Sequence, residues 1–133
     1  MTRSVLFFAA CLGLGACAYT SAGPFATSDE LPPPSQRVAV GLWDLGDQNC
    51  KGSIHAVAGK PYWVIDCRIK GGWGHCTHGL PLTRQLANQY ATTNGRTVFT
   101  LAEGGDLEET RDGKLVKSYP PLDGNICGVV PAR

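Results

Sequence analysis

The sequence predicts an all-β fold, a small antiparallel meander or barrel that is held together by two disulfides. From Arg37 onward, short apolar and β-branched runs alternate with glycine-containing turns, the pattern expected of an all-β domain. Asn94-Gly95 and Asp112-Gly113 favour tight turns between neighbouring strands. The expected strands are, in order, 38–45, 53–57, 62–65, 89–93, 96–102, 107–111 and 115–119.

The second and third expected strands form a hairpin if Ala58-Gly59 is its two-residue loop. That loop pairs Ile54 with Trp63 and, further along, Cys50 with Cys67. Directly opposed residues of an antiparallel pair lie about 4.5–5.5 Å apart at Cα, which a disulfide accepts. The register therefore predicts a Cys50–Cys67 disulfide.

Two further cysteines, Cys76 and Cys127, follow in the same domain. An even number of cysteines in an exported protein indicates a disulfide framework. Cys76–Cys127 is then the second predicted disulfide, assigned by remainder once Cys50 and Cys67 are paired.

The stretch 82–90 leaves two alternatives open. Leu82, Leu86 and Tyr90 recur at helical spacing, which allows a helical turn. Asn94-Gly95 favours a hairpin in which Tyr90 faces Phe99 across the two strands. We therefore expect a strand from 89 onward, with a helical turn before it as the alternative.

The N-terminus has the pattern of a secretory signal. Arg3 precedes an apolar run over 5–15, and small residues follow it. The run is shorter than the roughly 20 residues of a membrane-spanning helix. The segment 1–16 is therefore expected to be a signal peptide that is removed.

Leu14-Gly15-Ala16-Cys17 resembles the lipobox of bacterial lipoproteins. The resemblance implies that Cys17 becomes the first residue of the mature protein, with a diacylglyceryl group on its sulfur and usually an acyl chain on its amino group. Two or more chains anchor a protein stably where one does not. An ordinary signal peptide with an unrelated cysteine is the alternative. Because Ala18 and Tyr19 are not acidic, the family analogy implies the outer membrane, facing the periplasm.

The residues after Cys17 are polar and small and end in three prolines, so 17–36 is expected to be a flexible, lipid-anchored linker. The expected β domain is 37–133. The 133-residue chain has 12 basic and 11 acidic side chains, and removing the signal with Arg3 leaves a formally neutral protein. No basic stripe is present, so nucleic acid is not an expected partner.

A glycine-rich loop over 70–80 contains the candidate binding residues Trp73, His75 and His78. His75, Cys76 and His78 offer nitrogen and sulfur ligands for zinc or copper. Their spacing is not that of a zinc finger, and a disulfide-bonded cysteine cannot ligate as a thiolate. We therefore expect no metal and no cofactor. Trp73 lies between glycines and is the tryptophan expected to be exposed, whereas Trp43 and Trp63 are expected in the core.

Catalysis is not expected. The sequence has no Gly-x-Ser-x-Gly motif, and a thiol paired with His75 or His78 would need a free cysteine in an oxidising compartment.

The stretches 41–45 and 62–64, with Cys50 and Cys67, resemble the small periplasmic inhibitors of bacterial metalloproteases, which are lipocalin-like barrels. A second similarity, at 90–95, is to membrane-bound lysozyme inhibitors, although their Ser-Gly-x-x-Tyr loop is absent here. Neither resemblance assigns inhibitory residues.

The sequence as a whole favours a non-catalytic envelope lipoprotein, anchored in the membrane, whose β domain is a binding or inhibitor module for a protein or small molecule. A structural accessory of an envelope assembly is the alternative. A metal-binding or hydrolytic protein that uses His75, Cys76 and His78 is a further one.

Overall fold

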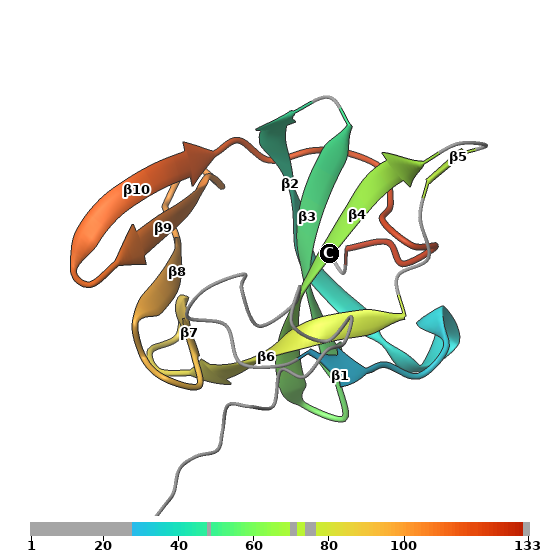
Figure 1. Ribbon diagram of the computed structural model, residues 1–133, viewed down its shortest axis with the longest axis horizontal. Helices are drawn as coiled ribbons and strands as arrows, with labels where there is room; N and C mark the ends of the chain where they lie inside the picture. The colour runs from blue at the N-terminus through green and yellow to red at the C-terminus, as the bar shows by residue number, and fades with distance from the viewer. Residues whose placement is uncertain (1–27, 48, 70–71, 74–76, 132–133) are drawn as a thin grey trace, which may run out of the picture.

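The computed structural model describes residues 28–47, 49–69, 72–73 and 77–131. The expected signal peptide and Cys17 lie outside these ranges. In the described part the fold is all-β, as predicted, and the strands form one antiparallel, nearly closed, barrel-like sheet (Figure 1). The elements are β1 (Asp29–Glu30), the 3₁₀ turn η2 (Pro34–Gln36), β2 (Val38–Asp47), β3 (Cys50–Val57), β4 (Lys60–Ile69), β5 (Gly72–Trp73), β6 (His78–Arg84), β7 (Gln89–Thr92), β8 (Thr97–Leu101), β9 (Leu107–Arg111) and β10 (Lys114–Tyr119).

The main sheet is a meander whose order is β10-β9-β8-β7-β6-β4-β3-β2, while β1 pairs with β6 and β5 with β4. The barrel is brought toward closure by the chain that follows β10. The Asp44 amide donates to the Pro120 carbonyl at 2.9 Å, and the Leu122 amide donates to the Leu42 carbonyl at 3.0 Å. The first and last strands of the meander are therefore linked through 120–122.

The β3–β4 hairpin confirms the predicted register. Ile54 pairs with Trp63 and Cys50 with Cys67, and a disulfide joins these two cysteines with their Cα atoms 4.0 Å apart. Ala58 has φ 51° and its neighbour Gly59 has φ 88°, so both loop residues adopt the positive φ of a type I′ turn. This turn matches the twist of the strands.

The last four strands of the meander also confirm the prediction to within a residue or two at their ends. Tyr90 pairs with Phe99, and Ala91 pairs with Val98. The loop around Asn94-Gly95 runs over 93–96, between the end of β7 at Thr92 and the start of β8 at Thr97. Within it, the Gly95 amide donates to the Thr92 carbonyl at 2.8 Å and closes a turn. The loop is longer than two residues, yet it leaves the register unchanged.

Two local expectations differ from the structure. Leu82–Arg84 belongs to β6, and Leu86 is 61% exposed in the turn that follows, so the helical spacing at 82–90 is coincidental. The glycine-rich stretch is not wholly a loop, because Gly72–Trp73 forms β5 and β6 begins at His78. Pairing decides the backbone conformation in both places, because β6 pairs with β7 and β5 pairs with β4.

The second predicted disulfide, Cys76–Cys127, includes a residue outside the described ranges. Cys50–Cys67 is the one disulfide of which the described part contains both cysteines, and Cys127 is disulfide-bonded as well. The pairing of Cys76 with Cys127 therefore stays a prediction.

The boundary expected at Arg37 lies too late in the chain. Asp29 and Glu30 pair with Gly79 and His78 of β6, and Leu31 is 8% exposed in a hydrophobic core. Residues 28–36 are thus part of the β domain and not of a flexible linker. Their prolines suit this path, because an extended segment needs few ladder hydrogen bonds.

Two cores lie on opposite faces of the β2–β3–β4 part of the sheet. The barrel interior holds mainly aromatic and long aliphatic side chains, Trp43, Ile54, Trp63, Leu82, Tyr90, Phe99 and Leu107. The second core lies beneath the terminal segments and comprises Leu31, Ala39, Leu42, Tyr62, Val64, Ile126 and Val129. The double coverage explains why β3 is buried at four successive residues, Gly52 to His55, where a half-exposed strand would alternate.

Glycine at 52 permits close packing inside the barrel. A Cβ there would lie 2.4 Å from the ring of Trp63, so only glycine lets that ring lie against β3. Both Trp43 and Trp63 are buried, as predicted. Within the described residues no helix is long and apolar enough to cross a bilayer.

Candidate functional site

The structure describes only part of the site expected from the sequence. His75 and Cys76 lie outside the described residues, and for Trp73 only the backbone, in β5, is described. His78 is exposed at the start of β6, with its Nδ1 3.0 Å from the Thr77 hydroxyl. The structure therefore does not show whether these four side chains converge.

Metal ligation can be assessed only within the described ranges. There, no three histidine, cysteine, aspartate or glutamate side chains are grouped so as to hold a metal ion. Because His75 and Cys76 are outside those ranges, this finding does not test the alternative that uses them.

A polar cluster lies where β9 and β10 leave the filled barrel interior. Alternate residues of β9 share one face, and Leu107 on that face is fully buried in the interior core. Glu109 follows on the same face and is 7% exposed. Its carboxylate accepts hydrogen bonds from the Tyr119 hydroxyl at 2.6 Å and from Arg111 Nη2 at 2.8 Å. We call these three residues, Glu109, Arg111 and Tyr119, the mouth cluster.

Burial and hydrogen bonding keep the Tyr119 hydroxyl of the mouth cluster protonated. Burial, and then the hydrogen bond to Glu109, raise the pKa of the Tyr119 phenol above its usual value. Tyr119 thus stays a neutral donor, and Arg111 supplies the positive charge that balances the Glu109 carboxylate. This arrangement orients the three side chains of the mouth cluster.

The mouth cluster adjoins both aromatic and polar groups of the interior. Phe99 pairs with Glu109 across the strands and stacks on Trp63, with ring centroids 4.6 Å apart. Thr97 pairs with Arg111, and both the Thr97 hydroxyl and Arg111 Nε are buried and make no hydrogen bond within the described structure. Unsatisfied buried polar groups are rare in native proteins, so this end of the barrel is a place to look for function.

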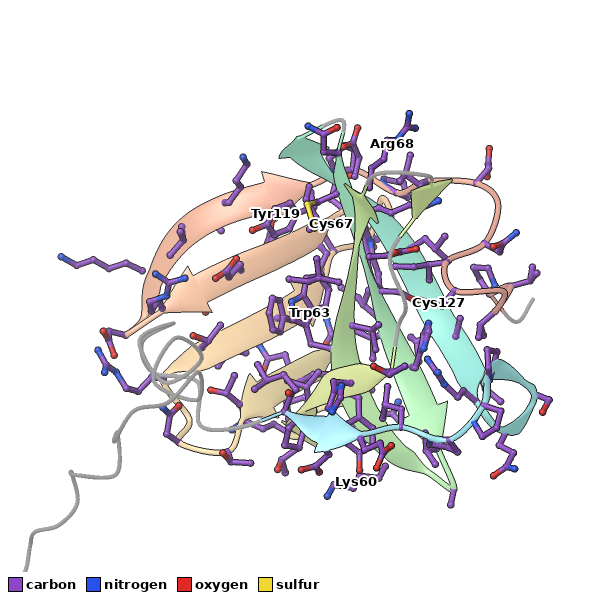
Figure 2. All side chains as sticks on the ribbon, turned by 45° about the vertical axis from the view of Figure 1, so that its right-hand side comes forward. Lys60, Trp63, Cys67, Arg68, Tyr119 and Cys127 are labelled. Atoms are coloured by element: carbon purple, nitrogen blue, oxygen red, sulfur yellow. A yellow bond between two sulfur atoms is a disulfide. The ribbon has the colours of Figure 1, made fainter. Side chains whose placement is uncertain are left out.

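Figure 2 shows where Tyr119 of the mouth cluster lies in the molecule. Tyr119 and Cys67 are toward one end of β4, and Lys60, the first residue of β4, is at the other. The disulfide ties β3 to β4 near the end that carries Tyr119. This end of the barrel is thus held by both covalent and hydrogen bonds.

The turn between β9 and β10 is held in place by Arg96, which lies in the β7–β8 loop. Arg96 donates two hydrogen bonds, both of 3.0 Å, to the two carboxylate oxygens of Asp112. The hydrogen bond from Arg96 lowers the pKa of the Asp112 carboxyl, so the pair stays charged well below neutral pH. Asp112 and Gly113 both have positive φ, at 52° and 83°, which closes a tight two-residue turn. The β9–β10 hairpin is therefore presented in a defined position.

The outer part of β10 exposes apolar side chains. Leu115 is 61% exposed and Val116 is 50% exposed, and the β9–β10 pairing is irregular between Leu115 and Lys117. Lys114 and Lys117, both exposed, flank the two apolar residues. We call the segment Lys114–Ser118 the β10 edge.

A buried basic pair lies in the second core. His55 is fully buried, and its Nδ1 lies 3.3 Å from Arg37 Nη1, while Arg37 Nε donates to the Pro32 carbonyl at 2.8 Å. Burial, and then the charge of Arg37, lower the pKa of His55 to about 4. The pair therefore holds the N-terminal segment on the sheet with a neutral imidazole.

Sequence reasoning did not find the mouth cluster, the β10 edge or the His55–Arg37 pair. Alternation in Leu107-Glu108-Glu109-Thr110-Arg111 signals that Glu109 shares a face with Leu107, and this is the signal that was available for the mouth cluster. Nothing in the sequence around Arg37 signals that His55 lies beside it.

Comparisons with known proteins give no family for this chain. No family model matches it, and neither a curated protein nor a solved structure is significantly similar to it.

Proposed function

We propose that the chain is a lipid-anchored envelope protein whose β domain binds a partner protein and catalyses no reaction. Two features support an anchored binding module. The stretch Leu14-Gly15-Ala16-Cys17 has the lipobox pattern, and the first strand, β1, begins at Asp29, 12 residues after Cys17 (29 − 17 = 12). At about 3.6 Å per residue, those residues keep the domain within roughly 40 Å of the anchor.

The filled barrel interior is the observation that carries the binding hypothesis. Trp43, Trp63, Tyr90 and Phe99 occupy the space in which a wider barrel would hold a small molecule, and each is less than a tenth exposed. The surface is then the place for recognition. The β10 edge combines exposed apolar side chains with a hairpin fixed by Arg96 and Asp112, which suits a protein partner better than a small ligand.

Photo-crosslinking in the native envelope tests the proposal. A photoreactive amino acid in place of Leu115 is expected to give a discrete crosslinked species with a second protein. The matched control carries the same amino acid in place of Leu86, which is also 61% exposed but lies in the β6–β7 turn. Equal yields from the two positions, or no discrete species from Leu115, would contradict the proposal.

The anchor is tested separately by the intact mass of the purified protein. We expect cleavage before Cys17, a mass increment for acyl chains on Cys17, and four thiols that become alkylatable only after reduction. Free thiols before reduction would instead revive the metal or hydrolytic alternative at His75, Cys76 and His78. A Cys17→Ser protein that is still processed and membrane-bound would show that Cys17 is not the anchor.

A further inference from the structure

We propose that the β10 edge binds an extended acidic segment of a partner protein, which adds to the sheet as one more antiparallel strand. The inference rests on the proposed function and specifies the chemistry of the partner. Strand addition to an exposed sheet edge is a common mode of peptide recognition, in which backbone hydrogen bonds provide affinity and side chains provide specificity.

The backbone of the β10 edge is available for a further strand. β10 ends the strand order and pairs with β9 alone. Across the described ranges, no backbone hydrogen bond links Lys114–Ser118 to any strand other than β9, because the bonds to β2 begin at Pro120. The side of this strand away from β9 therefore has no strand partner in the described structure, and the Lys117 side chain reaches toward Gly46 of β2, where a Cβ would lie 3.1 Å from Lys117 Nζ.

The side chains of the β10 edge specify what kind of strand fits. Leu115 and Val116 are at least half exposed and form an apolar pair, which favours two apolar residues opposite them. Lys114 and Lys117 stand on either side of that pair, and opposite charges directly across a ladder are stabilising. The complementary strand thus has two apolar residues between two acidic ones.

A second copy of the chain does not meet this requirement. If two copies of β10 paired antiparallel with Leu115 of one opposite Val116 of the other, Lys114 of each copy would lie opposite Lys117 of the other. Two lysine pairs would thus form. Like charges directly opposite one another are destabilising, and lysines on an edge strand are a known barrier to self-association. The same lysines that oppose self-pairing attract an acidic strand.

The N-terminal segment of the chain does not meet the requirement either. No acidic residue precedes Asp29, and Asp29 itself pairs with Gly79 of β6. The occupant that fits is therefore a segment of another protein.

Two synthetic peptides test the proposal by titration into the ¹⁵N-labelled mature protein. The acidic probe is acetyl-Thr-Glu-Val-Ile-Glu-Thr-amide, and its matched control has lysine in place of both glutamates. We expect the acidic probe to shift the amide signals of Lys114–Ser118 in a saturable way. The control peptide is expected to bind at least about fivefold more weakly, because both charge pairs become repulsive.

Charge-reversal variants supply the second comparison. Lys114→Glu and Lys117→Glu are each expected to weaken the acidic probe about threefold or more and to improve binding of the lysine peptide. Lys60→Glu reverses an exposed lysine at the start of β4, next to the β3–β4 turn, and is expected to leave both affinities unchanged. Unchanged thermal unfolding of all three variants would show that they are folded.

Several outcomes would overturn the proposal. These are equal affinities for the two peptides, shifts that map away from the β10 edge, and no shift up to the solubility limit of the acidic probe. Concentration-dependent dimerisation through the β10 edge would identify a second copy as the occupant instead. A crosslink from Leu115 in the envelope together with a failed peptide titration would retain the binding function and reject only the acidic strand.

Discussion

At the scale of single residues, the buried polar groups are the least expected feature of this domain. His55 is buried on the face of the second core, and Glu109 is buried on the face of the barrel interior. An arginine contacts each of them, Arg37 at His55 and Arg111 at Glu109. Burying such groups is costly unless they are hydrogen-bonded or neutral. His55 reduces the cost by staying neutral, while its buried Nε2 makes no hydrogen bond in the described structure, and Glu109 accepts two hydrogen bonds.

His55 makes the stability of the domain depend on pH. Its pKa is lowered to about 4 in the folded state by burial and by the charge of Arg37, against about 6.5 in an unfolded chain. The unfolded state therefore binds the proton first as the pH falls below 6.5, and the free energy of unfolding decreases until about pH 4. The full shift corresponds to about 3 kcal/mol.

Urea denaturation at several pH values measures this loss. We expect His55→Gln to flatten the dependence between pH 6.5 and 4, whereas His78→Gln, at an exposed position, retains it. The same slope in the His55→Gln and wild-type proteins would contradict the assignment.

Tyr119 tests the mouth cluster. Tyr119→Phe removes the donor to the Glu109 carboxylate and leaves one of its oxygens buried without that bond, so the free energy of unfolding should fall by about 1–3 kcal/mol. Ser118→Ala, at the exposed neighbouring position, should have little effect. Chemical denaturation measures both, and equal effects would show that the Tyr119 hydroxyl contributes nothing specific.

At the scale of elements, β1 and the segment after it show how a proline-rich stretch becomes part of a fold. Its local sequence indicates a linker, yet Gly79 of β6 lets it approach closely, because a Cβ there would lie 3.0 Å from Leu31 Cδ1 and 2.9 Å from Tyr62 Cβ. In the second core this segment and the C-terminal tail pack on side chains of β2 and β4. The element thus gains its structure from distant partners.

The substitution Leu31→Ala tests whether residues 28–36 are part of the folded domain or a linker. A buried leucine truncated to alanine costs about 2–5 kcal/mol, and we expect the lower half of that range at this edge of the core. Leu86→Ala, at a residue that is 61% exposed, should change stability little. Thermal or urea unfolding measures the stability of both variants. An effect of Leu31→Ala as small as that of Leu86→Ala would show that residues 28–36 are a linker.

At the scale of the whole molecule, the fold is a meander that nearly closes on itself around an aromatic interior. A domain of this size buries only about two-thirds of its unfolded surface, so a crosslink adds appreciably to its stability. The segment 120–122 bonds to β2, and the C-terminal tail then packs onto the second core. Both ends of the domain therefore cover the same sheet.

The Cys50–Cys67 disulfide tests the importance of that crosslink. The two cysteines are 17 residues apart, so the bond should contribute about 3 kcal/mol in the chain-entropy account. Replacing both by alanine should lower the midpoint of urea unfolding without changing the strand content seen by circular dichroism. An unchanged midpoint would show that β3 and β4 need no covalent link.

The sequence by itself determined the β3–β4 register and the strands other than β1, β5 and β6. Alternating runs and a two-residue loop fix which residues face one another, and Ala58-Gly59 thereby predicted both the Ile54–Trp63 pair and the Cys50–Cys67 disulfide. These features depend on neighbours in the chain, which a single sequence displays.

The tertiary structure alone decided which faces are covered and by what. It placed Leu31 in a core, put His55 beside Arg37, joined Tyr119 to Glu109 and left the β10 edge exposed. Each of these depends on the approach of strands that only sheet closure and terminal packing bring together. Local sequence propensity does not predict such contacts, because the burial of a residue depends on which distant segment packs over it.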